Sequence, residues 1–287
     1  MDLDQEALEA RRTLMERIAV RAGQIIQNVR DEARADVHQK SMDQGPVTKA
    51  DLEADTFLRS EIEQAWPNDG LISEENWAAG SPIRVQDHCW IIDPLDGTKD
   101  FIRGGEDYSV MIGFALQQKP VLGVVYQPSR GHLWSGNAIS GQCEYVDASG
   151  ERHRRALDNK ATAPSPVRIA ISRSHPENVI HDVLNSGDIQ VISKGSVGLK
   201  VALIIDGQAD VYLSGSTRTK VWDTCGPHAL MVAAGGEMSE LPGSALRYST
   251  EATHQRGLVA WSPAAKRVFE PSLTAWLAQN AGQSPFK

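Results

Sequence analysis

The sequence predicts an α/β protein whose first half is α+β and whose second half alternates strands and helices. Three observations support this fold class. Apolar residues recur at helical spacing between residues 4 and 66. Strand-length apolar runs separated by turn signals occupy residues 108–146. Beyond residue 160, strand-like and helix-like segments follow one another in turn, which is typical of α/β domains.

The first two elements are predicted helices. One covers about residues 4–35, because its apolar residues fall three and four positions apart on one face: Leu14, Ile18, Ala22, Ile25 and Val29. The second follows Thr48 and ends at the turn signal Pro67-Asn68-Asp69-Gly70. Thr48 and Asp51 have the spacing of a capping box, so Asp51 alone indicates a helix cap more readily than a catalytic group.

Two acidic motifs follow short apolar runs. Ser73-Glu74-Glu75 comes after Leu71-Ile72, and it is either a solvated strand end or first helical turn, or the source of a metal-binding carboxylate. Asp93-Pro94-Leu95-Asp96-Gly97-Thr98 comes after the buried strand that residues 89–92 predict. Pro94 has no N–H to donate and is expected to end the strand, whereas Gly97 permits a sharp turn.

The motif from Asp93 to Thr98 has two interpretations. Asp-Gly is a common turn pair, so both aspartates can serve in turns alone. Alternatively, two carboxylates this close to a core repel each other unless a cation or a proton neutralises them. Oxygen ligands without histidine or cysteine favour a hard cation such as Mg2+.

Residues 108–146 are predicted to form an antiparallel meander of strands with helices packed on one side. Residues 157–166, rich in turn formers, are the best candidate for a domain boundary. This gives an α+β domain over residues 1–160, with an antiparallel sheet and most of the metal ligands, and an α/β domain over residues 161–287. The second domain is predicted to contain strands 168–171, 189–192 and 209–213 and helices 176–184, 196–205 and 222–234.

Two motifs of the second domain are candidates for function. Ser172-Arg173-Ser174-His175 follows a strand end, where ligands commonly bind in α/β sheets, although a polar loop is the simpler interpretation. Asp223 opens the last predicted helix, either as a cap or as an acidic ligand that the second domain contributes.

Composition excludes several classes of protein. The net charge of −8 argues against a nucleic-acid-binding protein, which needs a basic face. No run reaches the roughly 18 apolar residues of a membrane span, and the N-terminus lacks the apolar stretch of a signal peptide. The three widely spaced cysteines, Cys89, Cys143 and Cys225, fit a reduced cytoplasmic protein better than a disulfide framework or a zinc site.

Four motifs together resemble those of the inositol monophosphatase superfamily in order and approximate spacing: Val47-Thr48-x-Ala50-Asp51, Ser73-Glu74-Glu75, Asp93-Pro94-Leu95-Asp96-Gly97-Thr98 and Trp222-Asp223. The resemblance covers nearly the whole chain. It implies a layered α-β-α-β-α sandwich of the sugar-phosphatase type and a lithium-sensitive phosphomonoesterase that uses two or three Mg2+ ions. It also implies a small phosphorylated substrate and a monomer or homodimer.

Within the superfamily, the chain is most similar to the 3′(2′),5′-bisphosphate nucleotidases, which remove the 3′-phosphate of adenosine 3′,5′-bisphosphate. The stretches that carry this similarity are 96–101, 171–175, Gly195-Ser196 with Leu199-Lys200, and 222–225. The alternative is the same reaction on inositol monophosphate or another small sugar phosphate.

The resemblance implies a role for each matching residue. The magnesium ligands would be Glu74, Asp93, the Leu95 carbonyl, Asp96 and Asp223. Thr98 and Asp51 would orient and deprotonate the attacking water, with Glu75 beside them. The substrate would contact the Gly97 and Thr98 N–H groups and the side chains of Lys40, His175, Ser196 and Lys200.

Two departures from the nucleotidase pattern concern the substrate pocket and leave the metal site alone. Ser214 stands where many of these enzymes have an arginine, and the nearest arginine is Arg218. The serine expected three residues before Lys200 is Val197, with Ser196 offset by one. Two other classes fit less well, because a silent binding module would lack a ligand and a two-metal nuclease would need a basic track for its strand.

Overall fold

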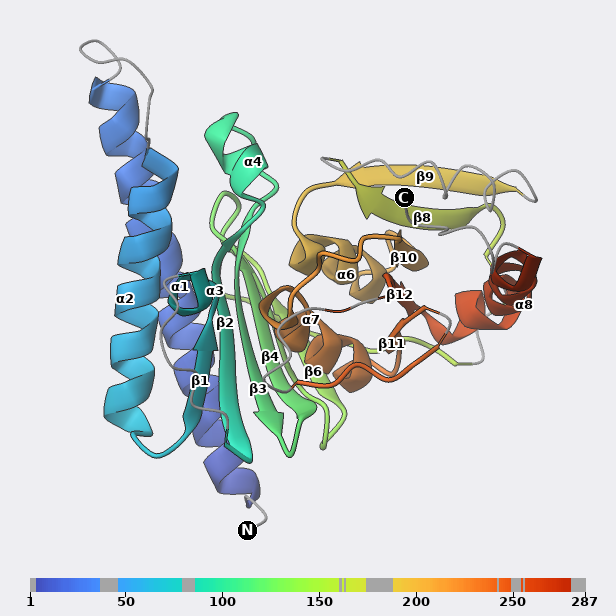
Figure 1. Ribbon diagram of the computed structural model, residues 1–287, viewed down its shortest axis with the longest axis horizontal. Helices are drawn as coiled ribbons and strands as arrows, with labels where there is room; N and C mark the ends of the chain where they lie inside the picture. Colours follow the sequence, from blue (N-terminus) through green and yellow to red (C-terminus); the bar gives the residue numbers. More distant parts are fainter. Residues whose placement is uncertain are drawn as a thin grey trace.

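The computed structural model describes residues 4–36, 46–78, 86–159, 162, 164–173, 188–241, 243–248, 254 and 256–279. Its elements form the α-β-α-β-α layers that the resemblance implied, and this expectation is confirmed (Figure 1). Helices α1 (Gln5–Asp36) and α2 (Pro46–Ala65) form the first layer, α6 (Val197–Ile205) and α7 (Val221–Ala233) the middle helical layer, and α8 (Pro263–Gln279) the last.

The first sheet has seven strands in chain order: β1 (Gly70–Ser73), β2 (His88–Asp96), β3 (Ser109–Leu116), β4 (Lys119–Gln127), β5 (His132–Asn137), β6 (Gln142–Val146) and β7 (Arg152–Arg155). All neighbours are antiparallel except β1 and β2, which run parallel with Ser73 opposite Ile92. Two short helices, α3 (Glu74–Ala78) and α4 (Thr98–Ile102), follow β1 and β2. The parallel pairing therefore brings Glu74 and Asp93 to the same edge of the sheet.

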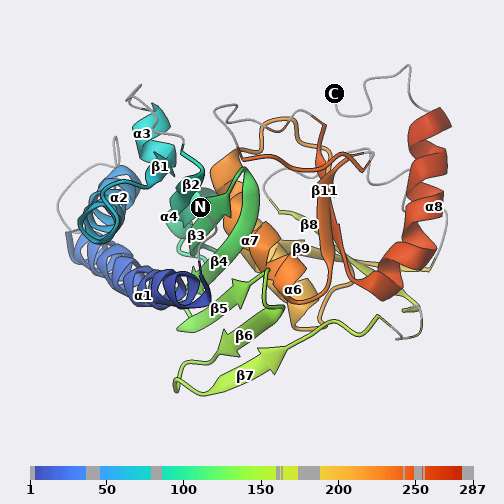
Figure 2. The ribbon, with the colours of Figure 1, turned by 90° about the horizontal axis from the view of Figure 1, so that it is seen from below.

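Helices cover both faces of this sheet, so the expectation of helices on one side was wrong. Trp90, Ile92 and Ile112 belong to the core that α1 and α2 form with the sheet. Ile91 and Met111, which alternate with them, pack in the core formed with α6 and α7. Figure 2 shows α6 and α7 between the two sheets. Because both faces of the central strands are buried, these strands are apolar without interruption.

The second sheet has five strands in the order β11-β12-β10-β8-β9. Strands β8 (Val167–Ser172), β9 (Ile189–Lys194) and β10 (Val211–Ser214) are parallel, and β11 (Glu237–Glu240) and β12 (Leu258–Trp261) complete the sheet as antiparallel strands. The sequence did not predict β7, β11, β12 or α8. The predicted helix 176–184 lies outside the described residues. One sheet precedes residue 160 and the other follows it, but a division into two domains there stays a prediction.

Within the described residues, no helix combines the length and the apolar character needed to cross a membrane.

Glycines allow α7 to lie very close to the first sheet. A Cβ atom on Gly123 of β4 would lie 2.1 Å from the Gly226 carbonyl oxygen, and one on Gly113 of β3 would lie 2.6 Å from the Sγ atom of Cys225. Neither position has room for a methyl group. This close packing fixes α7 against the sheet, and with it the position of Asp223 in its first turn.

We expect Gly123→Ala to lower the free energy of unfolding by about 1–3 kcal/mol, because the added methyl must push α7 away from β4. Urea unfolding measures this change. The matched control is Gly136→Ala on β5, where the nearest atoms are the Ala233 Cβ and a Leu230 methyl, both at 3.0 Å. These side-chain atoms can shift more easily than backbone, so the control should lose less. Equal losses in both variants would contradict the role of the Gly123–Gly226 contact.

Candidate active site

Three buried or half-buried aspartates, two from β2 and one from α7, meet beside the end of β2. Asp93, Asp96 and Asp223 each offer a carboxylate oxygen, and these oxygens all lie within 4.8 Å of one another. Strand β2 extends to Asp96 rather than ending at Pro94, but its register with β3 shifts between Asp93 and Asp96. This irregularity brings two carboxylates of one strand into the same cluster.

Backbone N–H groups hold each of these carboxylates. The Leu95 N–H donates to Asp93 Oδ1 at 3.0 Å, and the Lys220 N–H donates to Asp223 Oδ2 at 2.7 Å. Asp96 accepts the Val197 N–H at the start of α6. The N-cap of α7 is Lys220 and not Asp223, but Asp223 helps to cap the helix from its third position through a capping box and also reaches the acidic cluster. The two interpretations of Asp223 are compatible.

Helix α2 and the end of β1 place further carboxylates next to this cluster. Asp51 lies buried on α2, and Glu74 and Glu75 open α3. Asp55, one turn after Asp51, accepts a hydrogen bond from the Ser73 hydroxyl and another from Arg59 Nε at 2.7 Å. Asp55 thus anchors the residue that precedes Glu74. Sequence reasoning missed it, although its position four residues after Asp51 on the same helix was a usable signal.

Burial and mutual repulsion keep protons on this cluster at unusually high pH. Burial, with the charge of Glu75 next, raises the pKa of Asp51 to about 7 and that of Glu74 to about 7. Burial, followed by the charge of Asp96, raises the pKa of Asp223 to about 8, and burial raises the pKa of Asp93 well above its ordinary value. An oxygen-only donor set with excess negative charge fits a hard divalent cation such as Mg2+.

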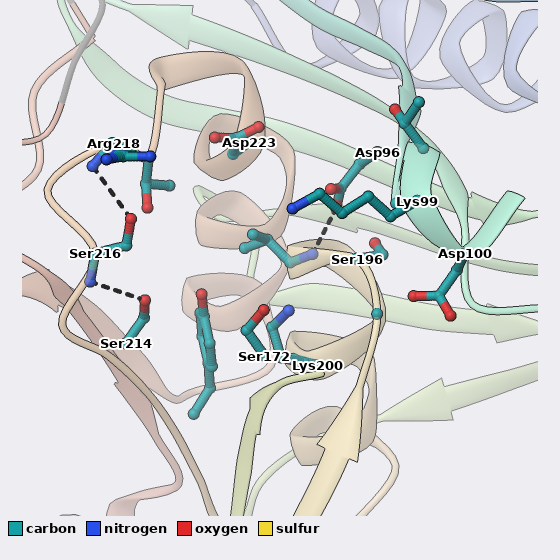
Figure 3. A pocket seen from close by; sticks show the side chains of 16 residues that line it. Asp96, Lys99, Asp100, Ser172, Ser196, Lys200, Ser214, Ser216, Arg218 and Asp223 are labelled. Carbon is teal, nitrogen blue, oxygen red and sulfur yellow. Dashed lines mark hydrogen bonds between the residues drawn. The ribbon is translucent and has the colours of Figure 1, made fainter. Parts of the chain in front are cut away.

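A cavity of about 270 Å3 opens beside the cluster (Figure 3). Its walls combine residues 96–100 with side chains of the second half of the chain: Ser172, Ser196, Lys200, Ser214, Arg218 and Asp223. Of the predicted site residues, Asp96, Gly97, Thr98, Ser196, Lys200 and Asp223 line this cavity. The other predicted acids do not line the cavity but interact electrostatically with its acidic residues: Asp51, Glu74, Glu75 and Asp93. Lys40 and His175 lie outside the described residues.

Thr98 lies at the start of α4, directly after Gly97. Gly97 has a φ of 92°, which favours glycine, and a Cβ atom there would lie 2.5 Å from the Asp107 carbonyl oxygen. The Thr98 hydroxyl donates to the Leu95 carbonyl at 3.1 Å. Among the described residues, no hydrogen bond joins Thr98 to Asp51, so the Thr98–Asp51 pair stays a prediction.

Ser196 and Lys200 lie on one face at the start of α6. The Ser196 hydroxyl accepts the Leu199 N–H at 3.2 Å and lies 2.8 Å from the Ser109 hydroxyl. Lys200 is only 3% exposed, and its Nζ lies 5.2 Å from the centre of the Tyr212 ring. Burial lowers the pKa of Lys200 to about 8, although the charges of Asp96 and Asp223 act against this. The Lys200 side chain therefore places a basic group in the cavity wall next to the acidic cluster.

Comparison with known proteins agrees with this geometry. The profile of the inositol monophosphatase family matches residues 7–284. The 3′(2′),5′-bisphosphate nucleotidase CysQ of Salmonella typhimurium is 34% identical over 233 residues, which cover 81% of this chain and 91% of that protein. The crystal structure of CysQ from Bacteroides thetaiotaomicron superposes with a TM-score of 0.75 at 26% identity, covering 88% of this chain and 97% of that one. Mycobacterium tuberculosis SuhB shares the fold, with a TM-score of 0.72 at 21% identity over 93% of this chain and 97% of its own.

The raised carboxylate pKa values predict that the metal-free protein loses stability as pH rises towards 8. The folded state keeps protons on Asp51, Glu74 and Asp223 up to pKa values of about 7 to 8, whereas the unfolded chain releases them near the ordinary values of 3.8 to 4.5. Unfolding therefore becomes more favourable between these limits. The buried His228 and His254, with pKa lowered to about 4, act in the opposite direction only below about pH 6.5.

Thermal unfolding in EDTA between pH 6.5 and 8 measures this effect, and Tm should fall across the window. Added Mg2+ should raise Tm more at pH 8 than at pH 6.5, because more of the carboxylates are then ionised. Asp96→Asn removes one repelling charge and should flatten the slope. A metal-free Tm that rises from pH 6.5 to 8 would contradict the cluster's electrostatics.

Proposed function

The chain belongs to the inositol monophosphatase family, and we propose that it is a 3′(2′),5′-bisphosphate nucleotidase that hydrolyses adenosine 3′,5′-bisphosphate to AMP and phosphate. The family is generally metal-dependent, and for this chain we propose two or three Mg2+ ions. The observation that carries the proposal is the meeting of Asp93, Asp96 and Asp223 at a cavity that also contains Lys200. The aspartates can bind the metal ions that contact the reacting phosphate. The Lys200 ammonium can bind the second phosphate, which is not hydrolysed.

The proposed ligands are Glu74, Asp93, the Leu95 carbonyl, Asp96 and Asp223. When bound, the ions would neutralise the phosphate oxygens and make the attacking water more acidic. The Gly97 and Thr98 N–H groups cradle the reacting phosphate.

In this proposal the attacking water is oriented and deprotonated by three residues: Thr98, Asp51 and Glu75. The Thr98 hydroxyl orients the water, and Asp51 accepts the proton. The pKa of about 7 that burial and Glu75 give to Asp51 supports this role, because a base works best near the operating pH. Glu75 lies next to the ligand Glu74 and maintains the charge that tunes Asp51.

The proposed substrate is inferred from two basic side chains in the second half of the chain. Lys200 lines the cavity from α6 and Arg218 from the loop before α7 (Figure 3). A buried ammonium and an exposed guanidinium suit a substrate with two phosphates better than one with a single phosphate. The nucleotidase relatives support the same choice over inositol monophosphate or another sugar phosphate. His175 and Lys40 remain proposed substrate contacts.

Other features stay proposals as well. We propose the domains 1–160 and 161–287, a monomer or homodimer, lithium sensitivity and a cytoplasmic location. The three cysteines, Cys89, Cys143 and Cys225, are free and buried, which supports a reducing compartment.

A phosphate-release assay tests the function directly. With Mg2+ present, the enzyme should release phosphate from adenosine 3′,5′-bisphosphate with a higher kcat/KM than from inositol 1-phosphate or fructose 1,6-bisphosphate. A preference for inositol 1-phosphate would replace the nucleotidase proposal with the sugar phosphatase.

Asp96→Asn should remove most turnover while the fold persists. The amide oxygen can still accept the Val197 N–H, but the charge that a cation needs is gone. Phosphate release and circular dichroism together measure this outcome. Full activity of the variant at ordinary Mg2+ concentrations would show that Asp96 is not a ligand.

Lys200→Met should raise KM for adenosine 3′,5′-bisphosphate and leave kcat nearly unchanged, because a contact with the non-reacting phosphate is the same in ground and transition states. A charge-assisted contact of about 1.5–3 kcal/mol corresponds to a rise of roughly 10- to 150-fold. Methionine keeps the volume of this buried side chain. The control substrate is inositol 1-phosphate, whose KM should change little, and equal losses on both substrates would assign Lys200 to the reacting phosphate or to the fold.

A further inference from the structure

Four charged side chains join the two halves of the chain beside the cavity. Arg173 directly follows β8, and Lys194 ends β9 in the second sheet. Asp100 lies in α4, and Asp107 lies just before β3 of the first sheet. We call Arg173, Lys194, Asp100 and Asp107 the Arg173 clamp. It lies outside the acidic cluster, and the proposed function assigns no role to it.

The Arg173 clamp is closely connected. Arg173 Nη1 lies 2.7 Å from Asp100 Oδ1, and Arg173 Nη2 pairs with Asp107. Lys194 Nζ lies 2.5 Å from Asp107 Oδ1. One guanidinium therefore bridges two carboxylates of the first half, and both carboxylates are buried. Burial would raise the pKa of Asp107, but Lys194 and Arg173 outweigh it and lower that pKa below its ordinary value.

Both acids of the clamp hold the segment that carries Thr98. The Asp100 N–H donates to the Gly97 carbonyl at 2.9 Å, so Asp100 belongs to the turn that Gly97 and Thr98 open. On the other side, a Cβ atom on Gly97 would lie 2.5 Å from the Asp107 carbonyl oxygen. The backbone at Gly97 is thus confined between residues whose side chains Arg173 binds.

The second half also approaches this segment closely. A Cβ atom on Gly195 would meet Asp100 Oδ2 and, at 2.5 Å, the Asp107 carbonyl oxygen. Gly195 precedes Ser196 and the Val197 N–H that binds Asp96. The clamp therefore sits where residues 97–107 of the first half meet residues 193–197 of the second.

Resting on the proposed function, we propose that the Arg173 clamp positions Thr98 for water activation, which makes Arg173 a positioning residue for hydrolysis. Its guanidinium binds Asp100 and Asp107 and so holds the intervening backbone, and with it the Thr98 hydroxyl, in the position that orients the attacking water. Arg173 thus serves the site through Asp100 and Asp107, instead of by contact with substrate.

The chain offers a matched control at the opposite end of β8. Arg168 near the start of β8 pairs with Asp210 through Nε at 2.9 Å and Nη2 at 2.8 Å. Its side chain is 33% exposed, against 41% for Arg173, and the acids they bind are similarly buried. Both partners of the Arg168 pair belong to the second half. Arg168→Ala therefore removes an equivalent ion pair without touching the Thr98 segment.

Steady-state kinetics with adenosine 3′,5′-bisphosphate at saturating Mg2+ test the proposal. Arg173→Ala should lower kcat roughly 10- to 100-fold, since a displaced catalytic group costs about this much. KM and the half-saturating Mg2+ concentration should change little, because the metal ligands and Lys200 stay in place. Arg173→Lys, which can pair with one acid only, should recover part of kcat, and Arg168→Ala should keep wild-type kcat.

A double-mutant cycle with Thr98→Ala separates positioning from general support of the fold. If Arg173 acts through Thr98, Arg173→Ala should cost little further kcat once Thr98 is gone. An undiminished loss in the Thr98→Ala background, or wild-type kcat in Arg173→Ala, would overturn the proposal.

Hydrogen–deuterium exchange keeps the test independent of the substrate. Amides of residues 97–107 should exchange faster in Arg173→Ala and at the wild-type rate in Arg168→Ala. Unchanged exchange in Arg173→Ala would overturn the clamp itself. If the wild-type enzyme released no phosphate from any substrate, the proposed function would fail, while exchange would still decide whether the clamp holds this segment.

Discussion

The central constraint on this structure is a cluster of buried carboxylates that repel one another. Asp93, Asp96 and Asp223 form this cluster, with Asp51 and Glu74 next to them, and burial strengthens their repulsion. The fold tolerates this because each aspartate of the cluster accepts a backbone N–H and because Lys200 lies nearby. An excess of negative charge suits cations, so the electrostatic cost of the metal-free cluster and the metal binding that we propose have the same origin.

The middle helical layer carries this arrangement. Helices α6 and α7 pack in one hydrophobic core with residues from both sheets, so the same two helices cover one face of each sheet. Helix α6 contributes the N–H that holds Asp96, and α7 contributes Asp223. Glycines at the contact of α7 with β3 and β4 allow the helix to approach the sheet closely and so set the distance between them. Glycines that do not line the cavity thus help to determine where Asp223 lies.

Local patterns predicted much of this arrangement. The run of apolar residues before Asp93 identified β2, and its unbroken character is typical of a strand that is buried on both faces. Sequence could not predict Asp107 or the ion pairs of Arg173, because their partners are brought near only by tertiary folding. Strand β7 was missed because its Arg-His-Arg-Arg sequence has no apolar alternation, as suits a charged edge strand. Metal, substrate and catalytic roles remain predictions that rest on the family resemblance.

The shared helix layer has a consequence for biosynthesis. All strands of the first sheet have left the ribosome once residue 155 has emerged, yet the face with Ile91 and Met111 is not covered until α6 and α7 follow. During that interval the nascent chain presents an apolar sheet face to water, and such surfaces attract chaperones or other chains. The acidic cluster is likewise incomplete until Asp223 is made. The synthesis of residues 156–233 is therefore the interval in which this sheet face lacks its helical cover.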